Sequence, residues 1–253
     1  MLIKIHTISR IWKLRPQGIL HVGAHKAEEL KDYTEENWGH VYWIEANPEL
    51  AQKLERTLSP KTNTVLTCAA WDIDKKMLNF YENSESQASS LLPLKRHALY
   101  YPKIHTKLVY EVETRRIDTL FDSPLPFTFA NLDVQGAELQ VLRGFGGLIS
   151  SLDGLYLEVN KEELYEGCAN VKELDLYLQG FKFERVATRW IIGKGWGDAL
   201  YLNCERNKHH HYSRFMNTID SFPFYSRQIF SIFLVKARLM PLAKRIREKL
   251  RQH

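Results

Sequence analysis

Short apolar segments alternate with amphipathic helical patterns along most of the chain, and this alternation constrains the fold more than any other feature. In the first third, strand-like runs cover residues 18–23, 40–48 and 64–72, and helical patterns cover residues 27–38 and 48–59. Each strand–helix unit follows the last after about 25 residues. In such units the strands become parallel, with right-handed helical crossovers between them. The sequence therefore predicts one half of a doubly wound α/β sheet.

The alternation resumes in the second half of the chain, after a less regular section over residues 74–122 that holds strand candidates over 77–83 and 107–117. Strands are expected over 126–134 and 154–160, and helices over 136–146 and 169–180. Two further strand-like runs, 181–190 and 198–203, lie close enough in sequence to pair as an antiparallel hairpin. We expect a Rossmann-like α/β domain over residues 1–205, whose sheet is mostly parallel and has an antiparallel hairpin at its edge.

The positive charge of the chain is concentrated at one end. The net charge is +5, yet residues 206–253 hold eleven lysines and arginines against two acids, so residues 1–205 carry a net charge of −4. An acidic domain is a poor partner for a polyanion, and we expect no nucleic-acid partner. The basic tail, 206–253, interleaves apolar residues with its charges, which predicts an amphipathic helical tail that contacts a membrane peripherally. The alternative is a helix packed on the domain or on a second subunit, and the oligomeric state stays open.

Cysteine usage and hydropathy indicate the compartment. The three cysteines are too few and too scattered for a disulfide framework or a zinc site. Charges interrupt the apolar positions of residues 1–16, which predicts no signal peptide, and no run approaches the roughly 18 apolar residues of a membrane-spanning helix. We expect a cytoplasmic protein, or one held at the inner face of the membrane by its tail.

Two predicted strand ends carry residues suited to a nucleoside. Gly23 follows the first strand, where a glycine lets the backbone turn tightly and approach a ligand, although an ordinary turn would use it too. Glu45 ends the second strand, the usual place of an acid that binds the hydroxyls of a ribose, and Ala46 follows it. Glu28 and Glu29 at the start of the first helix would repel a pyrophosphate. This turn favours S-adenosylmethionine over NAD.

The end of the third predicted strand, CAAWD, suits an adenine. The small residues Ala69 and Ala70 would let backbone N–H groups reach the base, and Asp72 could accept a hydrogen bond from its exocyclic amine. A strand end followed by an ordinary turn aspartate is the alternative interpretation.

Three polar residues at the ends of the fourth and fifth regular strands point to catalysis. Asp133 and Glu158 would face the cleft, where they could deprotonate a hydroxyl or hold a divalent cation that acidifies it, and Asn160 would face the same cleft. The alternative for Asp133 is a helix cap. No cluster of histidine and cysteine supports zinc, and the metal is left unknown.

Candidates for the acceptor side come from less regular segments. Trp196 and Asp198 in GKGWGDALY would border the acceptor, or else anchor a glycine-rich hairpin turn, and Ser90 lies in a serine-rich segment. The less regular section also holds His97 and His105 and is either a substrate lid or a solvated loop.

Taken together, the motifs HVGAHKAEEL, VYWIEANPEL, ASSLL, VETRRIDTL, NLDVQGAELQVLRG, YLEVNKEELYEGCA and WGDALYLN resemble the FkbM family of methyltransferases over about residues 15–203. The resemblance implies a class I methyltransferase fold, S-adenosylmethionine as the methyl donor, and a hydroxyl oxygen of a sugar or natural product as the acceptor. It also implies a role for each matching position. His21, Gly23 and Ala24 would line the donor, Glu45 the ribose, Ala70 the adenine, and Asp133 the methyl group.

The chain departs from common methyltransferase motifs at three positions, which hold His21, Ala27 and Gln135. We expect an S-adenosylmethionine-dependent O-methyltransferase that acts on a glycan or another small-molecule acceptor. The alternatives are a nucleic-acid methyltransferase and a non-catalytic binding or scaffold protein that keeps the fold.

Overall fold

The computed structural model describes residues 1–207. Most of the predicted tail, 206–253, and its proposed membrane contact lie outside the described residues, and the boundary at residue 205 stays a prediction. Within residues 1–207, no helix is both long enough and apolar enough to cross a bilayer.

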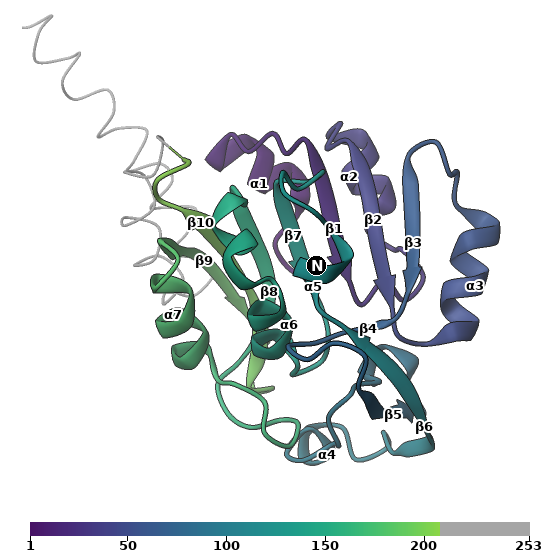
Figure 1. The fold of residues 1–253 in the computed structure, drawn as a ribbon. Coiled ribbons are helices and arrows are strands. Elements are labelled where there is room, and N and C mark those ends of the chain that lie inside the picture. Colours follow the sequence, from purple (N-terminus) through teal and green to yellow (C-terminus); the bar gives the residue numbers. More distant parts are fainter. Residues whose placement is uncertain (208–253) are drawn as a thin grey trace, which may run out of the picture. The chain divides into compact units, whose positions relative to one another are not determined.

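A seven-stranded sheet forms the centre of the fold (Figure 1), in the order β3-β2-β1-β7-β8-β10-β9. Its strands are β1 (Gly18–Val22), β2 (His40–Glu45), β3 (Asn63–Thr67), β7 (Phe129–Leu132), β8 (Gly154–Asn160), β9 (Phe183–Trp190) and β10 (Trp196–Asn203). The first five run parallel, whereas β10 pairs antiparallel with both β8 and β9. The predicted Rossmann-like sheet with its antiparallel edge hairpin is confirmed.

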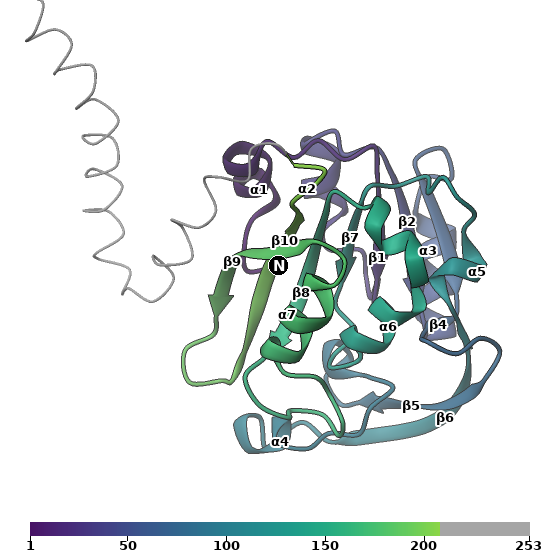
Figure 2. The ribbon, with the colours of Figure 1, turned by 60° about the vertical axis from the view of Figure 1, so that its left-hand side comes forward.

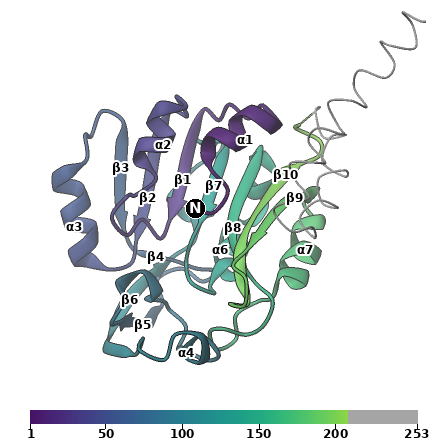
Figure 3. The same cartoon turned by 180° about the vertical axis from the view of Figure 1, so that it is seen from behind.

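Helices cover both faces of this sheet. On one face (Figure 3) lie α1 (Ile5–Trp12), α2 (Leu30–Glu35) and α3 (Pro48–Thr57). The other face (Figure 1) carries α5 (Ile117–Leu120), α6 (Glu138–Gly144), the 3-10 helix η2 (Gly146–Ser151) and α7 (Val171–Gln179). Each face has its own buried apolar cluster, the first around Trp38 and Trp43 and the second around Leu132 and Val141. Full burial of each such side chain contributes about 1.5–3 kcal/mol, which holds both helical layers on the sheet.

The sheet changes direction of winding between β1 and β7. β1 pairs with β2 on one side and with β7 on the other. The crossover connections on the two sides of β1 therefore run in opposite directions along the sheet. Open α/β sheets bind ligands beyond the carboxyl ends of their strands at such a switch point. Gly23 and Asp133 directly follow these two strands and therefore meet there.

The third predicted strand is wrong over its second half. The prediction ran it unbroken over residues 64–72, but β3 ends at Thr67, and Ala69–Ala70 form β4 in a separate sheet of order β4-β6-β5. The cause is a distant partner, because β4 pairs parallel with the end of β6 (Thr106–Arg115). Figure 2 shows this second sheet, completed by β5 (Met77–Asn83), below the central one. The two strands expected in the less regular section form β5 and β6, and the section also holds η1 (Ser86–Ala88) and α4 (His97–Tyr100).

The first predicted helix, 27–38, is also too long. His25 and Ala27 adopt left-handed backbone conformations, with φ of 46° and 56°, so the chain makes turns before α2 begins at Leu30. Asn37, with φ of 55°, ends the helical segment at its carboxyl end. As a consequence, Glu28 lies in the turn above the sheet and not in a first helical turn.

Candidate functional site

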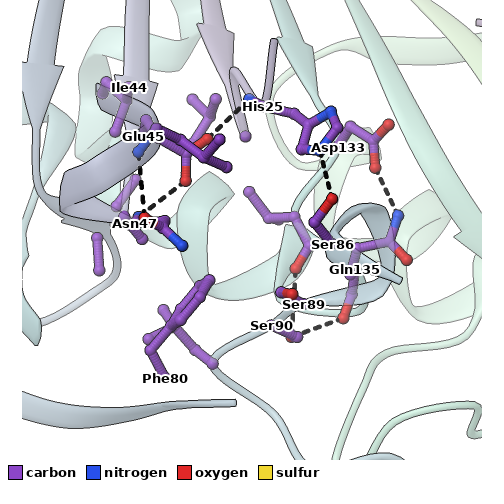
Figure 4. Close-up of a pocket in the computed structure, with 18 of the residues that line it drawn as sticks. His25, Ile44, Glu45, Asn47, Phe80, Ser86, Ser89, Ser90, Asp133 and Gln135 are labelled. Atoms are coloured by element: carbon purple, nitrogen blue, oxygen red, sulfur yellow. Dashed lines mark hydrogen bonds between the residues drawn. The ribbon is translucent and has the colours of Figure 1, made fainter. Parts of the chain in front are cut away.

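A pocket opens at the carboxyl ends of β1, β2 and β7, and we call it the switch-point pocket (Figure 4). The space between its walls is about 720 Å³, part of which is open to solvent. Six residues predicted to bind the cofactor line it, namely Gly23, Glu45, Ala46, Ala69, Ala70 and Asp133. Ser90, predicted on the acceptor side, lines this pocket as well.

Gly23 is required by the close approach of two backbone segments. Its φ is 84°, and a Cβ at this position would lie 1.9 Å from the carbonyl oxygen of Asp133. Its own N–H donates a 3.0 Å hydrogen bond to the carbonyl of Ile44. Only glycine lets the turn after β1 lie against the segment that presents Asp133.

Glu45 reaches into the switch-point pocket and is only 6% exposed. One carboxylate oxygen accepts the N–H of Asn47 at 2.8 Å, and the other accepts the N–H of His25 at 2.7 Å. Burial raises the pKa of this carboxyl group. Since each carboxylate oxygen can accept two hydrogen bonds, each keeps one free position. Two adjacent acceptor positions fit the two hydroxyls of a ribose.

The wall beside Glu45 is apolar and comes from both sheets. Cys68, Ala69 and Ala70 follow β3 and line the switch-point pocket together with Phe80 of β5, which packs in one apolar cluster with Ala69. An apolar wall of this kind suits a flat aromatic base. Asp72, the predicted partner of its amine, lies outside this lining, and its backbone carbonyl accepts from the Arg116 guanidinium at 2.6 Å.

His21 and Ala24 also lie outside the lining of the switch-point pocket. His21 points into the core on the side of α2, where its Nδ1 hydrogen-bonds with the Tyr33 hydroxyl at 3.1 Å. Burial lowers the pKa of His21 to about 4, so it is neutral at pH 7. Ala24 belongs to the buried apolar cluster beneath the same helix. Both residues support the turn after β1 from behind.

The turn after β1 adds a residue that the sequence analysis did not single out. His25 lines the switch-point pocket, and its Nε2 shares a 2.8 Å hydrogen bond with Ser86 Oγ of η1 (Figure 4). Its Nδ1 shares a 2.7 Å hydrogen bond with Glu28. The position of His25, two residues after Gly23, is the signal that could have found it.

Gln135 joins the two predicted catalytic carboxylates. Its side-chain nitrogen donates to Asp133 at 2.7 Å and to Glu158 at 2.9 Å, which uses both of its hydrogens. Its side-chain oxygen accepts from the Tyr165 hydroxyl at 2.7 Å. The amide is therefore fixed in orientation and holds the two carboxylates on either side of it.

The environment of these carboxylates changes their proton affinity. Asp133 is open to the cavity but is otherwise surrounded by protein, and this burial raises its pKa to about 6. Burial also raises the pKa of Glu158 well above its usual range, and the nearby Asp133 adds to the shift. A carboxylate with a pKa near 6 is mostly ionised at neutral pH and suits a general base.

Asp133 does not cap the helix that follows it. The helix α6 begins at Glu138, whose side chain accepts the N–H groups of Val134 at 3.3 Å and Gly136 at 3.2 Å. Burial raises the pKa of Glu138 to about 8. This leaves the carboxylate of Asp133 available to the cavity.

A second cavity, which we call the acidic cavity, adjoins the switch-point pocket and shares His25, Gln87, Asp133 and Gln135 with it. Glu158, Trp196 and Asp198, three of the predicted residues, line it too. The indole N–H of Trp196 donates to the Tyr101 hydroxyl at 3.2 Å, and Asp198 accepts the N–H of Leu2 at 2.6 Å.

Asn160 is fully buried outside the lining of both cavities, and its amide has no hydrogen-bond partner among the described residues. Residues 1–207 contain no group of three or more His, Cys, Asp or Glu side chains arranged to hold a metal ion.

A family model for the methyltransferase FkbM domain matches residues 21–185 of the chain. No curated protein matches it. The solved structures similar to it include Streptococcus pneumoniae Sp1610, named as a tRNA (m1A22) methyltransferase, at 13% identity and a TM-score of 0.43. The match covers 73% of this chain and 63% of Sp1610, which is less than two thirds of that protein.

Two further similar structures contain a bound cofactor. Sp1610 in complex with S-adenosyl-L-methionine has 12% identity and a TM-score of 0.45, with 79% of this chain and 71% of that one covered. M. capricolum TrmK in complex with S-adenosyl-homocysteine has 10% identity and a TM-score of 0.40, with 74% and 62% covered.

Proposed function

The chain belongs to the FkbM family of S-adenosylmethionine-dependent methyltransferases, and we propose that it methylates a hydroxyl oxygen of a sugar, glycan or natural product. The observation that carries this proposal is the meeting of two cavities at one carboxylate. Asp133 lines both the switch-point pocket and the acidic cavity. A donor in the first and an acceptor in the second would therefore have their reacting groups beside Asp133.

The residues of the switch-point pocket fit the donor. Glu45 offers two free acceptor positions for the ribose hydroxyls, and the apolar wall that contains Ala70 and Phe80 would take the adenine. Asp133 and the turn at Gly23 are left for the methionine end. Glu28 is exposed in the turn after β1. Its negative charge would repel the pyrophosphate of a dinucleotide.

Bound S-adenosylmethionine would supply an electrophilic methyl group, whose carbon would bond to the acceptor oxygen as its bond to sulfur breaks and the electron pair of that bond stays on sulfur. The chain contributes orientation and proton transfer. Asp133 accepts the hydroxyl proton at one of its carboxylate oxygens, and the Gln135 amide holds that carboxylate in place at 2.7 Å. Glu158 is held by the same amide, and burial raises its pKa well above its usual range.

Calorimetric titration tests the donor site. We expect S-adenosylmethionine and S-adenosylhomocysteine to bind the wild-type chain and NAD not to bind. Glu45→Ala removes the ribose contacts and should weaken binding of both adenosyl ligands at least about tenfold, or about 1.4 kcal/mol. Glu49→Ala, an exposed acid in the first turn of α3, is the matched control and should bind as the wild type does. Binding of NAD with equal affinity, or an unchanged affinity in Glu45→Ala, would contradict this assignment.

A further inference from the structure

A chain of hydrogen bonds leads from a buried tyrosine to the two carboxylates of the site. Tyr165 lies in the loop between β8 and α7, and its hydroxyl donates to the side-chain oxygen of Gln135 at 2.7 Å. The side-chain nitrogen of Gln135 donates in turn to Asp133 and Glu158. The hydroxyl of Ser90 donates to the backbone carbonyl of Gln135 at 2.8 Å. Ser90 therefore holds the main chain of Gln135, and Tyr165 holds its side chain.

The chemistry of the partners determines which way the Gln135 amide points. An amide can fill the same space in two orientations, which exchange its oxygen and its nitrogen. An ionised carboxylate only accepts hydrogen bonds, so Asp133 requires the nitrogen. The amide oxygen then faces Tyr165, which has to donate. Burial raises the pKa of the Tyr165 hydroxyl well above its usual range, so its proton is present at neutral pH.

Packing fixes the Tyr165 ring without help from its hydroxyl. The residue is fully buried, and its ring lies 5.3 Å from the ring of His97, measured between centroids. A Cβ added to Gly136 would lie 3.0 Å from the Cβ of Tyr165, so the tyrosine packs directly on the turn after Asp133. Besides Gln135, the acceptor nearest its hydroxyl is the Ala88 carbonyl, 3.4 Å away. The one short hydrogen bond of this hydroxyl therefore goes to the amide.

We propose that Tyr165 is a positioning residue for methyl transfer, whose hydroxyl keeps the nitrogen of the Gln135 amide, and not its oxygen, turned toward Asp133. This inference rests on the proposed function, in which Asp133 is the base. Tyr165 itself stays out of contact with both substrates, because it lines neither the switch-point pocket nor the acidic cavity.

The proton affinity of Asp133 reports the orientation of the amide. An N–H group beside a carboxylate favours its ionised form, whereas an oxygen in the same place disfavours it. In Tyr165→Phe the buried amide oxygen loses its donor, which is costly, and the reversed orientation becomes competitive. The substitution leaves the other titratable groups around Asp133 in place. These groups are the α-ammonium of Met1, His25, Glu29, Tyr33, Glu138, Glu158 and Asp198.

Carbon-13 NMR of the ligand-free full chain, labelled at its aspartate carboxyl carbons, follows this titration directly. The signal of Asp133 is the one that Asp133→Asn removes, and its midpoint in the wild type is expected near pH 6. In Tyr165→Phe we expect a midpoint at least about 0.5 pH unit higher, which is about a threefold gain in proton affinity.

Tyr201→Phe is the matched control. Tyr201 is 1% exposed, and its hydroxyl also donates to a side chain, that of Asp175 at 2.8 Å, in a network apart from Gln135. Loss of this hydroxyl should leave the midpoint of Asp133 unchanged.

Gln135→Met tests whether Tyr165 acts through the amide. Alone, it should raise the midpoint at least as much as Tyr165→Phe does, because it removes the donor to Asp133. The double variant should have the midpoint of Gln135→Met, since the two residues act in one chain. An unchanged midpoint in Tyr165→Phe, an equal rise in Tyr201→Phe, or a further rise in the double variant would overturn the inference.

A measurement on the unaltered chain covers the case in which Tyr165→Phe does not fold. The two side-chain N–H signals of Gln135, identified by their loss in Gln135→Met, should exchange with solvent more slowly than those of the exposed Gln179. Equal exchange at the two glutamines would contradict a fixed amide. None of these measurements requires turnover, so they are separate from the proposed function, which a wild-type rate of methyl transfer in Asp133→Asn would refute.

Discussion

Asp133 is exposed to both cavities and is held in place by the residues around it. It faces the cavity on one side, while the backbone on its other side lies against Gly23 and its carboxylate is bonded to Gln135. This arrangement gives it a pKa of about 6 without any positive partner in its immediate hydrogen bonds. A base of this strength is ionised at neutral pH and can still take a proton in a transition state.

The rate of methyl transfer should therefore depend on pH through Asp133. Its ionised form is the active one, so kcat should rise with pH and level off above a midpoint near 6. Asp133→Asn keeps the shape of the side chain but cannot accept the proton, and we expect kcat to fall on the order of 10²- to 10⁴-fold. Steady-state kinetics across pH 5 to 8 provide the measurement. A wild-type rate in Asp133→Asn would exclude Asp133 as the base.

Gly23 should be the least replaceable glycine of the site. In Gly23→Ala the new methyl group would need the space of the Asp133 carbonyl, and the backbone would hold an unfavourable positive φ. We expect the free energy of unfolding to fall by more than about 1 kcal/mol, and donor affinity to fall with it. Urea denaturation measures the first effect and calorimetry the second.

Gly147→Ala is the matched control for this change. Its Cβ would have no neighbour within 4 Å, and its φ lies outside the positive range. This variant should therefore be about as stable as the wild type. Similar losses in the two variants would show that the contact with Asp133 is not the cause.

At the level of elements, α7 offers a local test of stability away from the site. Asn170 caps this helix by accepting the N–H groups of Lys172 and Glu173, and the Glu173 side chain accepts the N–H of Asn170 in return. Asn170→Ala should cost about 1 kcal/mol of unfolding free energy without changing donor affinity. Lys172→Ala, within the same turn, is the control. A loss of donor binding in Asn170→Ala would show that α7 and the switch-point pocket are coupled.

The regular strands could be predicted because their signal is local. β1 and β8 are mostly apolar and buried at every position, and glycine or a polar turn bounds them. The break after Thr67 could not be predicted, because β4 is defined by its pairing with Thr114 and Arg115 far along the chain. The early end of the first helical pattern depends on left-handed conformations at non-glycine residues, which sequence patterns do not reveal.

The candidate site was predictable to the extent that strand ends determine it. Gly23, Glu45 and Asp133 follow parallel strands, and the topology brings such positions to one edge. The contact of His25 with Ser86 joins segments 61 residues apart and leaves no local signal. The roles of the predicted residues in binding and catalysis stay predictions for the experiments above.

For the whole molecule, residues 1–207 hold both cavities and the full match to the family model. The basic segment that follows, with its hypothesised attachment to a membrane, is a separate question. A chain that ends at residue 207 should bind S-adenosylhomocysteine with the affinity of the full chain. In flotation with vesicles that contain anionic lipid, the full chain should float and the shortened one should stay at the bottom. Undiminished flotation of the shortened chain would rule out the tail as the attachment.

The backbone at the switch point also determines how quickly its amide protons are lost to solvent. The N–H groups of Gly23 and Ala24 both donate to the Ile44 carbonyl, and that of Asp133 donates to Val22. These bonds join three neighbouring strand ends, so none can open without disturbing the others, and deuterium should replace these protons only in rare large openings. The free and the donor-bound protein should then show nearly the same exchange at these three amides. Ligand binding would order little backbone here, because this part of the site is already rigid.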